Sequence, residues 1–536
     1  MITCDLLVIG GGPAGISAAV AAGKAGLNVL LLEERERLGG QLTKQTHRFF
    51  GSVAERAGTR GIAIIKDLET VVSQLKNVEV SLSTTALGIY EDGVATALKG
   101  RKMIKIKPKA IIVATGAFEK FLPFENNDLP GVYGAGAVQT LMNIYGVLPA
   151  RRLLMIGSGN IGLIVSYQLV QAGAEVVGVV EAASKIGGYL VHASKIRRLG
   201  IPIYPSCTIK KAIGKERVEG AELVRLDEKW KEIPGSQFTV DCDAICLAVG
   251  LNPLIDLLGQ SGCLFKYIPE LGGQVPVRDE SMRTNVPFLY IAGDLSSIEE
   301  ATAALLEGEL AGLNAASQIR PDLNLEARVE EVKGHLRALR AGPVGEKIRA
   351  GLSKLTGESA LSSPQSGRNT IEELSRTGIA SSANLAGVLP DETRKKRRAY
   401  AVIECYQQIP CDPCVHSCPF GAIKPFSDIN DLPIVDFDLC TGCGQCIGRC
   451  PGLAIFTVDE TREGDRAKVT LPYEFIPKPA REATVDLMDR SGKRVGQGVV
   501  KAVLNTPKQD KTTIVTVEMD KNLVQEVRHI RVVQNT

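Results

Sequence analysis

Cysteine is the residue type in this chain whose spacing most clearly predicts chemistry. The sequence has 536 residues and 13 cysteines, and eight of the cysteines lie between residues 405 and 450. They form two runs, Cys405-x5-Cys411-x2-Cys414-x3-Cys418-Pro419 and Cys440-x2-Cys443-x2-Cys446-x3-Cys450-Pro451. Thiolate sulfur is a ligand of iron–sulfur clusters and of zinc. Thiols clustered in this way favour metal over a disulfide framework.

The second run resembles the bacterial two-cluster ferredoxin pattern, in which the fourth cysteine of each run ligates the other cluster. The first run departs from it, because Gln408 stands where the first cysteine is usual and Cys405 lies about one turn earlier. The resemblance implies two [4Fe–4S] clusters. Their ligands would be Cys405, Cys411, Cys414 and Cys450 for cluster 1, and Cys440, Cys443, Cys446 and Cys418 for cluster 2. A three-iron or labile first cluster remains open, and zinc is the alternative metal.

A glycine-rich turn at the start of the chain is the second chemical signal. Residues 5–41 read DLLVIGGGPAGISAAVAAGKAGLNVLLLEERERLGGQ, which predicts a buried strand, the turn Gly10-x-Gly12-x-x-Gly15, a helix and a second strand. Gly12 would let the backbone approach a pyrophosphate at the N-terminus of the helix. Glu33, about 20 residues on, would accept a hydrogen bond from a ribose hydroxyl. The stretch therefore predicts a dinucleotide site.

The same pattern recurs at residues 151–181, RRLLMIGSGNIGLIVSYQLVQAGAEVVGVVE. Its glycines are Gly157, Gly159 and Gly162, and its second strand ends at Glu181. Glu181 would repel a 2′-phosphate and no arginine follows it directly, so the pattern favours NAD(H) over NADP(H). A Rossmann domain that binds nothing, or a different adenine nucleotide, remains the alternative.

Two other strands are expected to end beside the first glycine turn. The strand 110–114 ends on Thr115-Gly116, which would bring backbone close to a nucleotide. The strand within 284–294 ends on Gly293-Asp294, and this acid would hold a ribityl hydroxyl. The strand 243–253 is expected to close the second domain in the same way.

The polar stretch after Gln41 contains His47, Arg48 and the pair Phe49-Phe50. We expect it either to lie over a bound cofactor or to be a surface loop with an aromatic anchor. His47 would lie near the flavin but is not expected to act as a general base. No catalytic acid, base or nucleophile is predicted elsewhere in the chain.

Residues 1–320 resemble the flavoprotein superfamily with two dinucleotide-binding domains that includes thioredoxin reductase and glutathione reductase. The motifs that carry the resemblance are GGGPAG, Glu33, GGQ, ATG, GSGNIG and AGD. The resemblance implies FAD at Gly10, Gly12, Pro13, Ala14, Gly15, Glu33, Glu34, Gly40, Gln41, Ala114, Thr115, Gly116, Gly293 and Asp294. It implies NAD or another adenine nucleotide at Gly157, Gly159, Asn160, Ile161, Gly162, Glu181 and Gly250.

The chain lacks the redox disulfides of those enzymes. No C-x-x-C precedes the second glycine turn and no C-x4-C follows GGQ, so a flavin could not reduce a protein disulfide at either place. The stretch 129–159, LPGVYGAGAVQTLMNIYGVLPARRLLMIGSG, is similar to the FAD-containing α subunits of opine oxidase, dye-linked proline dehydrogenase and hydrogen cyanide synthase. That similarity implies a hetero-oligomer, in which a partner flavoprotein chain oxidises the substrate.

The predicted fold class is α/β, with two Rossmann-like dinucleotide-binding domains, a small α+β ferredoxin-like 2[4Fe–4S] domain and a small C-terminal β domain. The expected parts are an FAD-binding domain at 1–120 and 251–320, an NAD(H)-binding-type domain at 121–250, a helical arm and linker at 321–400, a ferredoxin-like domain at 401–460 and a β domain at 461–536.

Composition narrows the function. A net charge of +3 gives no argument for nucleic acid or an anionic membrane, and no apolar run approaches the roughly 18 residues of a transmembrane helix. We expect a cytoplasmic location, because the N-terminus reads as a core strand rather than a signal peptide.

The expected function is electron transfer between NAD(H), FAD and two [4Fe–4S] clusters, as the α subunit of an amine or amino-acid dehydrogenase or a similar enzyme. Partners would be a substrate-oxidising flavoprotein subunit or a ferredoxin-type carrier. The alternatives are an electron-relay subunit with a non-catalytic nucleotide, and a stand-alone ferredoxin–NAD reductase.

Overall fold

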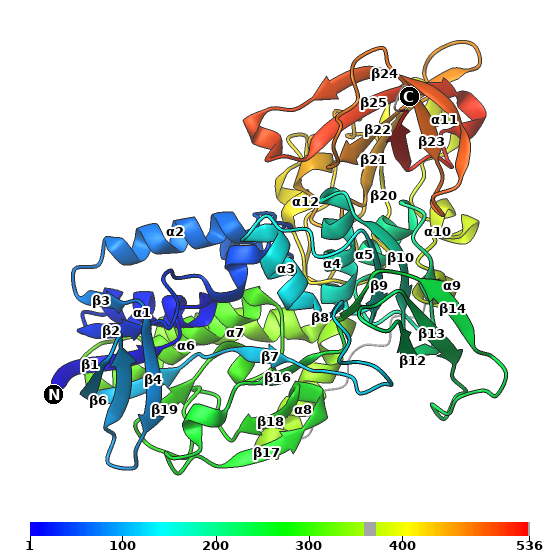
Figure 1. Cartoon of the computed structure of the whole chain (residues 1–536). Helices are drawn as coiled ribbons and strands as arrows, with labels where there is room; N and C mark the ends of the chain where they lie inside the picture. The colour runs from blue at the N-terminus through cyan, green and yellow to red at the C-terminus, as the bar shows by residue number, and fades with distance from the viewer. Residues whose placement is uncertain (358–370, 534–536) are drawn as a thin grey trace. The chain divides into compact units, whose positions relative to one another are not determined.

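The computed structural model describes residues 1–357 and 371–533 and divides the chain into two units. Unit 1 comprises residues 1–120, 250–365 and 428–430, and unit 2 comprises residues 121–249, 366–427 and 431–536. Within the expected linker, residues 358–370 lie outside the described residues. Figure 1 labels the elements of both units along the chain.

Unit 1 is built on a seven-stranded sheet with the order β3-β2-β1-β6-β5-β4, and with β19 paired to β6. Its parallel strands are β1 (Ile2–Ile9), β2 (Val29–Leu32), β3 (Val78–Ser81), β6 (Lys102–Val113) and β19 (Leu289–Ile291). The hairpin β4 (Thr84–Ile89) and β5 (Ala95–Lys99) extends the sheet in antiparallel fashion. The chain order reverses at β1, which is where open α/β sheets bind ligands.

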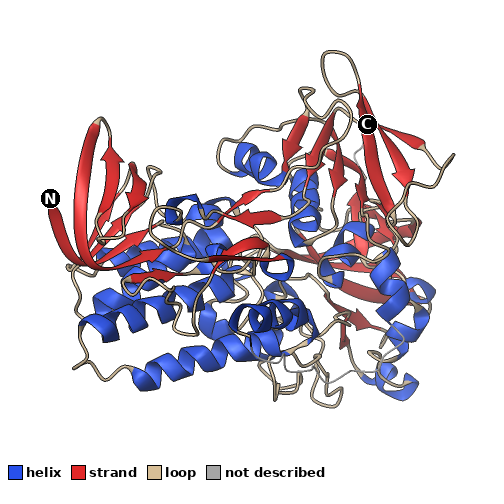
Figure 2. Cartoon of the chain, turned by 90° about the horizontal axis from the view of Figure 1, so that it is seen from below, coloured by secondary structure: helices blue, strands red, loops and turns tan. Residues whose placement is uncertain are grey.

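The inner strands of this sheet are apolar without alternation because both of their faces are covered. One face carries α1 (Pro13–Lys24), α2 (Gly61–Ser73), α6 (Ala301–Ile319) and α7 (Glu326–Ala341). Figure 2 shows helices gathered along the strands. Helices α1 and α6 pack closely, since a Cβ on Gly308 would lie 2.0 Å from the Ala14 carbonyl oxygen. The small residues that make these segments Ala- and Gly-rich therefore serve helix contact.

The rest of unit 1 consists of short elements. They are the pair β7 (Ala117–Glu119) and β16 (Leu251–Pro253), the hairpin β17 (Phe265–Ile268) and β18 (Gly273–Pro276), and helix α8 (Glu346–Thr356). Leu355 of α8 packs into a small core with Leu271 and Val275.

Unit 2 begins with a second parallel sheet, in the order β11-β10-β9-β15-β8. Its strands are β8 (Val132–Gly134), β9 (Arg152–Ile156), β10 (Glu175–Val180), β11 (Ile203–Tyr204) and β15 (Ala244–Leu247). Helices α3 (Ala135–Asn143), α4 (Asn160–Gln171) and α5 (Leu190–Arg197) share one core with this sheet. The antiparallel strands β12 (Cys207–Ile213), β13 (Gly220–Arg225) and β14 (Phe238–Asp241) cover the other face. Short helices follow at α9 (Glu372–Thr377), α10 (Ser382–Ala386) and α11 (Glu392–Arg397).

A seven-stranded antiparallel sheet completes unit 2, in the order β20-β21-β22-β25-β24-β23-β26. Its strands are β20 (Tyr400–Ile403), β21 (Ile455–Asp459), β22 (Arg466–Tyr473), β23 (Thr484–Met488), β24 (Arg494–Leu504), β25 (Thr513–Asp520) and β26 (His529–Val532). Both cysteine runs, with the short helix α12 (Pro413–His416), fall in the connection between β20 and β21. The expected boundary at residue 460 lies between two neighbouring strands of this one sheet.

The predicted α/β class and the terminal β sheet are confirmed. Among the helices of the described residues, none has the length and apolar content that a bilayer crossing requires.

Candidate cofactor sites

The first glycine turn has the geometry of a phosphate cradle. Gly10 has φ +107°, and a Cβ there would lie 2.3 Å from the Ala114 carbonyl oxygen. A Cβ on Gly15 would lie 1.8 Å from the Gly10 carbonyl oxygen, so glycine is required at both positions. Gly12, the N-cap of α1, is different, because a Cβ there would meet no described atom closer than Gly40 Cα at 4.0 Å. The chain itself leaves the space above Gly12 free for a ligand at the helix N-terminus.

Glu33 fixes the end of β2 to this turn. Its buried carboxylate accepts the Gly11 N–H at 2.7 Å and the Arg35 N–H at 2.9 Å. Gly39 donates its N–H to the Gly11 carbonyl at 2.7 Å, which holds the GGQ segment against the turn. Glu34 and Gln41 are exposed, whereas Pro13 and Ala14 form the first turn of α1.

The other predicted strand ends meet the first turn at the same edge of the sheet. Parallel pairing aligns Ile9 with Val113, and Val113 with Ile291, so that Gly10, Ala114 and Ala292 follow at one edge. The Thr115 hydroxyl donates to the Leu254 carbonyl at 3.0 Å, and Gly116 has φ +75°. Open α/β sheets bind ligands at this edge.

Asp294 lies at this edge, one residue after Gly293 in a 3-10 turn. Burial raises the pKa of the Asp294 carboxyl to about 7, and the nearby acids Glu307 and Glu299 raise it further. Gly293 donates its N–H to Glu307 at 3.1 Å, and Glu307 in turn pairs with Arg340 at 2.7 Å.

The loop with His47 and Arg48 is anchored within unit 1. The buried Arg48 guanidinium donates to the Gly58 carbonyl, and the His47 ring stacks on Phe49 with centroids 4.9 Å apart. The Thr302 hydroxyl donates to the Phe50 carbonyl at 3.0 Å. These contacts are those of the aromatic anchor. That the loop covers a cofactor stays a prediction.

The second glycine turn repeats the geometry of the first. Gly157 has φ +106°, and a Cβ there would lie 2.3 Å from the Ala248 carbonyl oxygen. A Cβ on Gly162 would lie 2.0 Å from the Gly157 carbonyl oxygen. Gly159 is the N-cap of α4, and a Cβ there would meet no described atom within 4 Å. Asn160 and Ile161 begin the helix.

Glu181 occupies the position of Glu33. Its carboxylate accepts the Ser158 N–H at 3.0 Å, the Ser158 hydroxyl at 2.6 Å and the Ala183 N–H at 2.8 Å. Gly250, predicted for this site, belongs to unit 1, and its carbonyl accepts the Lys120 N–H at 2.9 Å there.

Sequence reasoning missed the loop that packs on the second turn. Gly188 donates its N–H to the Ser158 carbonyl at 2.9 Å, and Tyr189 donates its N–H to Asn160 Oδ1 at 2.7 Å. A Cβ on Gly188 would lie 2.8 Å from the Asn160 nitrogen. The sequence held a signal for this loop, because Gly187 follows Glu181 by the same six positions that separate Gly39 from Glu33.

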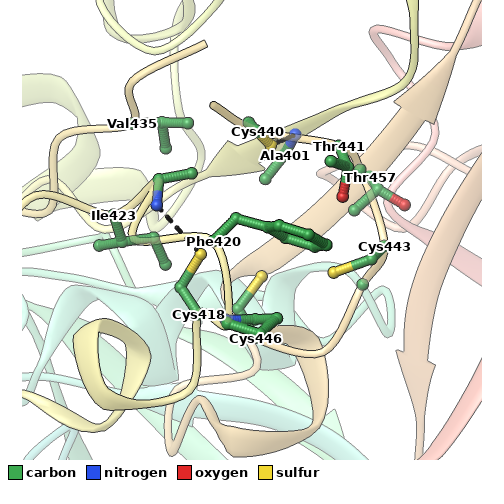
Figure 3. Close-up of a pocket in the computed structure, with 14 residues that line it drawn as sticks. Ala401, Cys418, Phe420, Ile423, Val435, Cys440, Thr441, Cys443, Cys446 and Thr457 are labelled. Carbon is green, nitrogen blue, oxygen red and sulfur yellow. Dashed lines mark hydrogen bonds between the residues drawn. The ribbon is translucent and has the colours of Figure 1, made fainter. Parts of the chain in front are cut away.

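The thiols predicted for cluster 2 surround one hollow of about 350 Å³ that is partly open to solvent. Figure 3 shows the sulfur atoms of Cys418, Cys443 and Cys446 turned toward it, with the Phe420 ring among them. Cys440 lines the same hollow, and Cys443 is exposed. Cys418 thus joins three cysteines of the other run, as the predicted crossing requires. Two backbone N–H groups donate to these sulfurs, Ala422 to Cys418 at 3.3 Å and Ala401 to Cys440 at 3.4 Å.

Three of the thiols predicted for cluster 1 are near neighbours. Burial raises the pKa of Cys414 to about 12, and the neighbouring Cys450 raises it further. Burial likewise raises the pKa of Cys405, where Cys450 and Cys414 also act. The fourth, Cys411, is half-buried and precedes α12 by two residues. Metal binding would deprotonate such thiols, because the ion's positive charge stabilises the thiolate.

Among the described residues, no three His, Cys, Asp or Glu side chains converge closely enough to ligate one metal ion. Four thiols around a hollow suit a cluster, which is larger than one ion. The residues of both sets therefore fit thiolate-ligated iron–sulfur clusters.

Comparison with known families gives two matches. A family model described as pyridine nucleotide-disulphide oxidoreductase matches residues 4–308. A model described as 4Fe-4S binding domain matches residues 433–456, which include the whole second cysteine run.

Individual relatives are more distant. The first of the two named subunits of opine oxidase from Rhizobium meliloti (strain 1021) is 27% identical over 359 residues, which cover 62% of this chain and 76% of the relative. The alpha chain of sarcosine oxidase from the same strain is 31% identical over 274 residues, which cover 48% of this chain and only 25% of the relative. The solved thioredoxin reductase of T. acidophilum has a TM-score of 0.50 at 22% identity, covering 59% of this chain and 99% of that one. This last likeness concerns the fold alone.

Proposed function

The chain belongs to the pyridine nucleotide-disulphide oxidoreductase family, and from this premise we propose that it moves electrons between NAD(H), FAD and two [4Fe–4S] clusters. It is an FAD-dependent oxidoreductase with a 4Fe-4S domain, related to subunits of larger oxidases. The observation that carries the proposal is the presence, in one chain, of two glycine turns of equal geometry and two crossed sets of thiols. FAD, when bound, exchanges a two-electron hydride for single electrons, which is the form in which clusters accept them.

The first turn is proposed to hold FAD. Gly12 leaves the helix N-terminus open for the pyrophosphate, and Glu33 is in place to receive ribose hydroxyls. Asp294, at the same sheet edge, would accept a ribityl hydroxyl. The remaining residues predicted for FAD keep their proposed roles on the strand ends and the GGQ segment.

The second turn is proposed to hold NAD(H). Gly159 is as open as Gly12, and Glu181 carries a negative charge where a 2′-phosphate would otherwise sit. In the alternative function this site holds a non-catalytic adenine nucleotide and the chain only relays electrons. The loop that packs Gly188 against Asn160 favours this alternative, because it covers the turn on which a nucleotide would exchange.

The chain is proposed to work as one subunit of a hetero-oligomer, with substrate oxidised on a partner flavoprotein chain. Two relatives are named as subunits, and no cysteine in the described residues forms a disulfide that could receive electrons. A ferredoxin-type carrier is the other candidate partner. The third alternative, a stand-alone ferredoxin–NAD reductase, would need no partner chain, and size-exclusion chromatography of the native enzyme distinguishes it.

Anaerobic titration with NADH tests the proposal. We expect flavin and cluster absorbance to bleach together in the iron-loaded protein, and the variant Gly159→Ala to lose this response while dithionite still reduces it. If neither NADH nor NADPH bleaches the wild-type protein and dithionite does, the relay alternative replaces the proposal.

A further inference from the structure

A buried group of charges lies beside the first cysteine run. Glu404, the residue before Cys405, accepts Arg490 at 2.6 Å and Arg528 at 2.5 Å on the same carboxylate oxygen. Burial alone would raise the pKa of Glu404, but the charges of Arg528 and Arg490 lower it to about 2. Glu404 and Arg528 are buried, and the Arg490 side chain is 11% exposed.

Arg198 adds a third guanidinium to this group. It is buried at the C-cap of α5, where it donates to the Leu453 carbonyl at 3.1 Å. Arg198 and Arg528 both lie over the Phe456 ring, 5.2 and 5.1 Å from its centroid. Burial lowers the pKa of Arg198 to about 10, so it remains charged at neutral pH.

The group has two positive charges in excess, since Glu404 is the one acid that acts on Arg198 beside Arg490 and Arg528. Arg528 Nη2 is buried and has no hydrogen-bond partner among the described residues. Excess buried charge is costly unless an anion balances it. The structure therefore implies an anion beside these guanidiniums.

Cluster 1 is the anion that the geometry offers. Cys405 follows Glu404 directly, and Arg198 is the cation that lowers the pKa of the Cys450 thiol against the effect of burial. A four-iron cluster with four thiolates has two net negative charges when oxidised and three when reduced. Nearby positive charge therefore stabilises the reduced state more than the oxidised state.

We propose that Arg198, with Arg528 and Arg490, raises the reduction potential of cluster 1 and leaves that of cluster 2 unchanged. The proposal rests on the two-cluster function proposed above. Arg198 is a positioning residue that acts through its charge. It stands on the nucleotide-binding part of unit 2, so that part of the chain supplies a determinant of the cluster potential.

Arg394 provides a matched control at the other cluster. It is buried in α11, and it donates to the carbonyl oxygens of Cys440 at 2.7 Å and of Phe437 at 2.6 Å. Charge lost at Arg394 should therefore be felt at cluster 2, and charge lost at Arg198 at cluster 1.

The test is an anaerobic potentiometric titration of the full, iron-loaded chain with dithionite and redox mediators, followed by electron paramagnetic resonance. We expect Arg198→Gln to lower the midpoint potential of one cluster signal only. Arg198→Lys should keep the wild-type value more closely because it keeps the charge. Arg394→Gln should lower the potential of the other signal. Unchanged potentials in iron-replete Arg198→Gln would overturn the proposal.

A second variant covers loss of iron from Arg198→Gln. Arg490→Gln removes one positive charge while Arg528 stays paired with Glu404, and it should lower the same midpoint potential. No shift in that variant also overturns the proposal. Because no NADH is used, these outcomes do not depend on the nucleotide proposal. An iron content that fits one cluster, with a single signal, would overturn the two-cluster function and this inference together.

Discussion

At the residue scale, the two glycine turns separate glycines that the fold requires from glycines that a ligand requires. Gly10 and Gly157 have positive φ and abut backbone oxygen atoms, so the chain cannot replace them. Gly12 and Gly159 have ordinary φ values and open surroundings. A side chain at these two positions would collide with a bound pyrophosphate rather than with the protein.

Alanine at each open position should therefore remove one ligand and leave the fold intact. We expect Gly12→Ala to lose FAD and Gly159→Ala to lose the second nucleotide, with the free energy of unfolding of the ligand-free protein changed by less than about 1 kcal/mol. Gly10→Ala, in contrast, should destabilise by about 1–3 kcal/mol through its positive φ alone. Flavin content and denaturant unfolding measure these effects. Full FAD retention in Gly12→Ala would contradict the first-site assignment.

FAD affinity should depend on pH through Asp294. With its pKa at about 7, the FAD-free carboxyl is protonated below that pH. A ribityl hydroxyl binds the carboxylate more strongly than the neutral acid, so FAD binding releases this proton. Affinity should therefore fall by up to about tenfold for each pH unit below about 7 and stay level above it. Flavin fluorescence titrations measure it. Asp294→Asn should abolish the slope, and an equal slope in that variant would contradict the assignment.

Single cysteine replacements should distinguish the two clusters. We expect Cys414→Ser and Cys443→Ser each to remove about half of the iron while FAD stays bound, because the ligand sets are separate. Cys4→Ser, outside both runs, is the matched control and should keep all iron. Iron analysis beside the flavin spectrum measures this. Loss of FAD together with iron would mean that the cofactor sites depend on each other.

At the element scale, the elements around the clusters are joined by few but buried contacts. The carboxylate of Glu404, directly after β20, accepts guanidiniums from Arg490 and Arg528, which flank β24 and β26. At the other side of cluster 1, the Leu190 N–H at the start of α5 donates to Gln407 at 2.9 Å. Gly452 packs on α5, where a Cβ would lie 2.8 Å from a Val191 methyl group.

Neutralising Glu404 should destabilise this region strongly. Glu404→Gln leaves two buried guanidiniums without their counter-charge, which costs about 3–5 kcal/mol. Thermal unfolding of the iron-loaded protein measures the change. The control Glu482→Gln breaks an exposed ion pair with Lys501 and should change the unfolding temperature little. Equal effects of the two substitutions would show that burial of the Glu404 pair does not matter.

Local sequence signals predicted the two turns and the cysteine sets because each depends on spacing within some 40 residues. They could not predict the partners of β20. That strand is paired with β21, which lies more than 50 residues on, and alternation identifies a strand without identifying its neighbour. The excess charge at cluster 1 was equally hidden, because Arg198, Arg490 and Arg528 are single residues far apart in the sequence and only the tertiary fold gathers them.

At the scale of the whole molecule, the resemblance to flavoproteins with two dinucleotide-binding domains is confirmed by the family match over residues 4–308. The domain boundaries and the individual site residues stay predictions. The nucleotide-type sheet, the cysteine runs and the terminal sheet all belong to unit 2, whereas the FAD-type sheet belongs to unit 1. Electron transfer between FAD and the clusters would therefore connect the two units.

The place of the cysteine runs in the terminal sheet has a consequence for the chain before iron arrives. Strands β20 and β21 are paired neighbours in a sheet whose core of valine, leucine and aromatic side chains contains no cysteine among the described residues. The sheet can therefore form as one cooperative unit while the connection of residues 404–454 stays open. In the iron-free protein, amide hydrogen exchange should be slow in β22, β24 and β25 and fast in that connection, and iron should slow the connection alone.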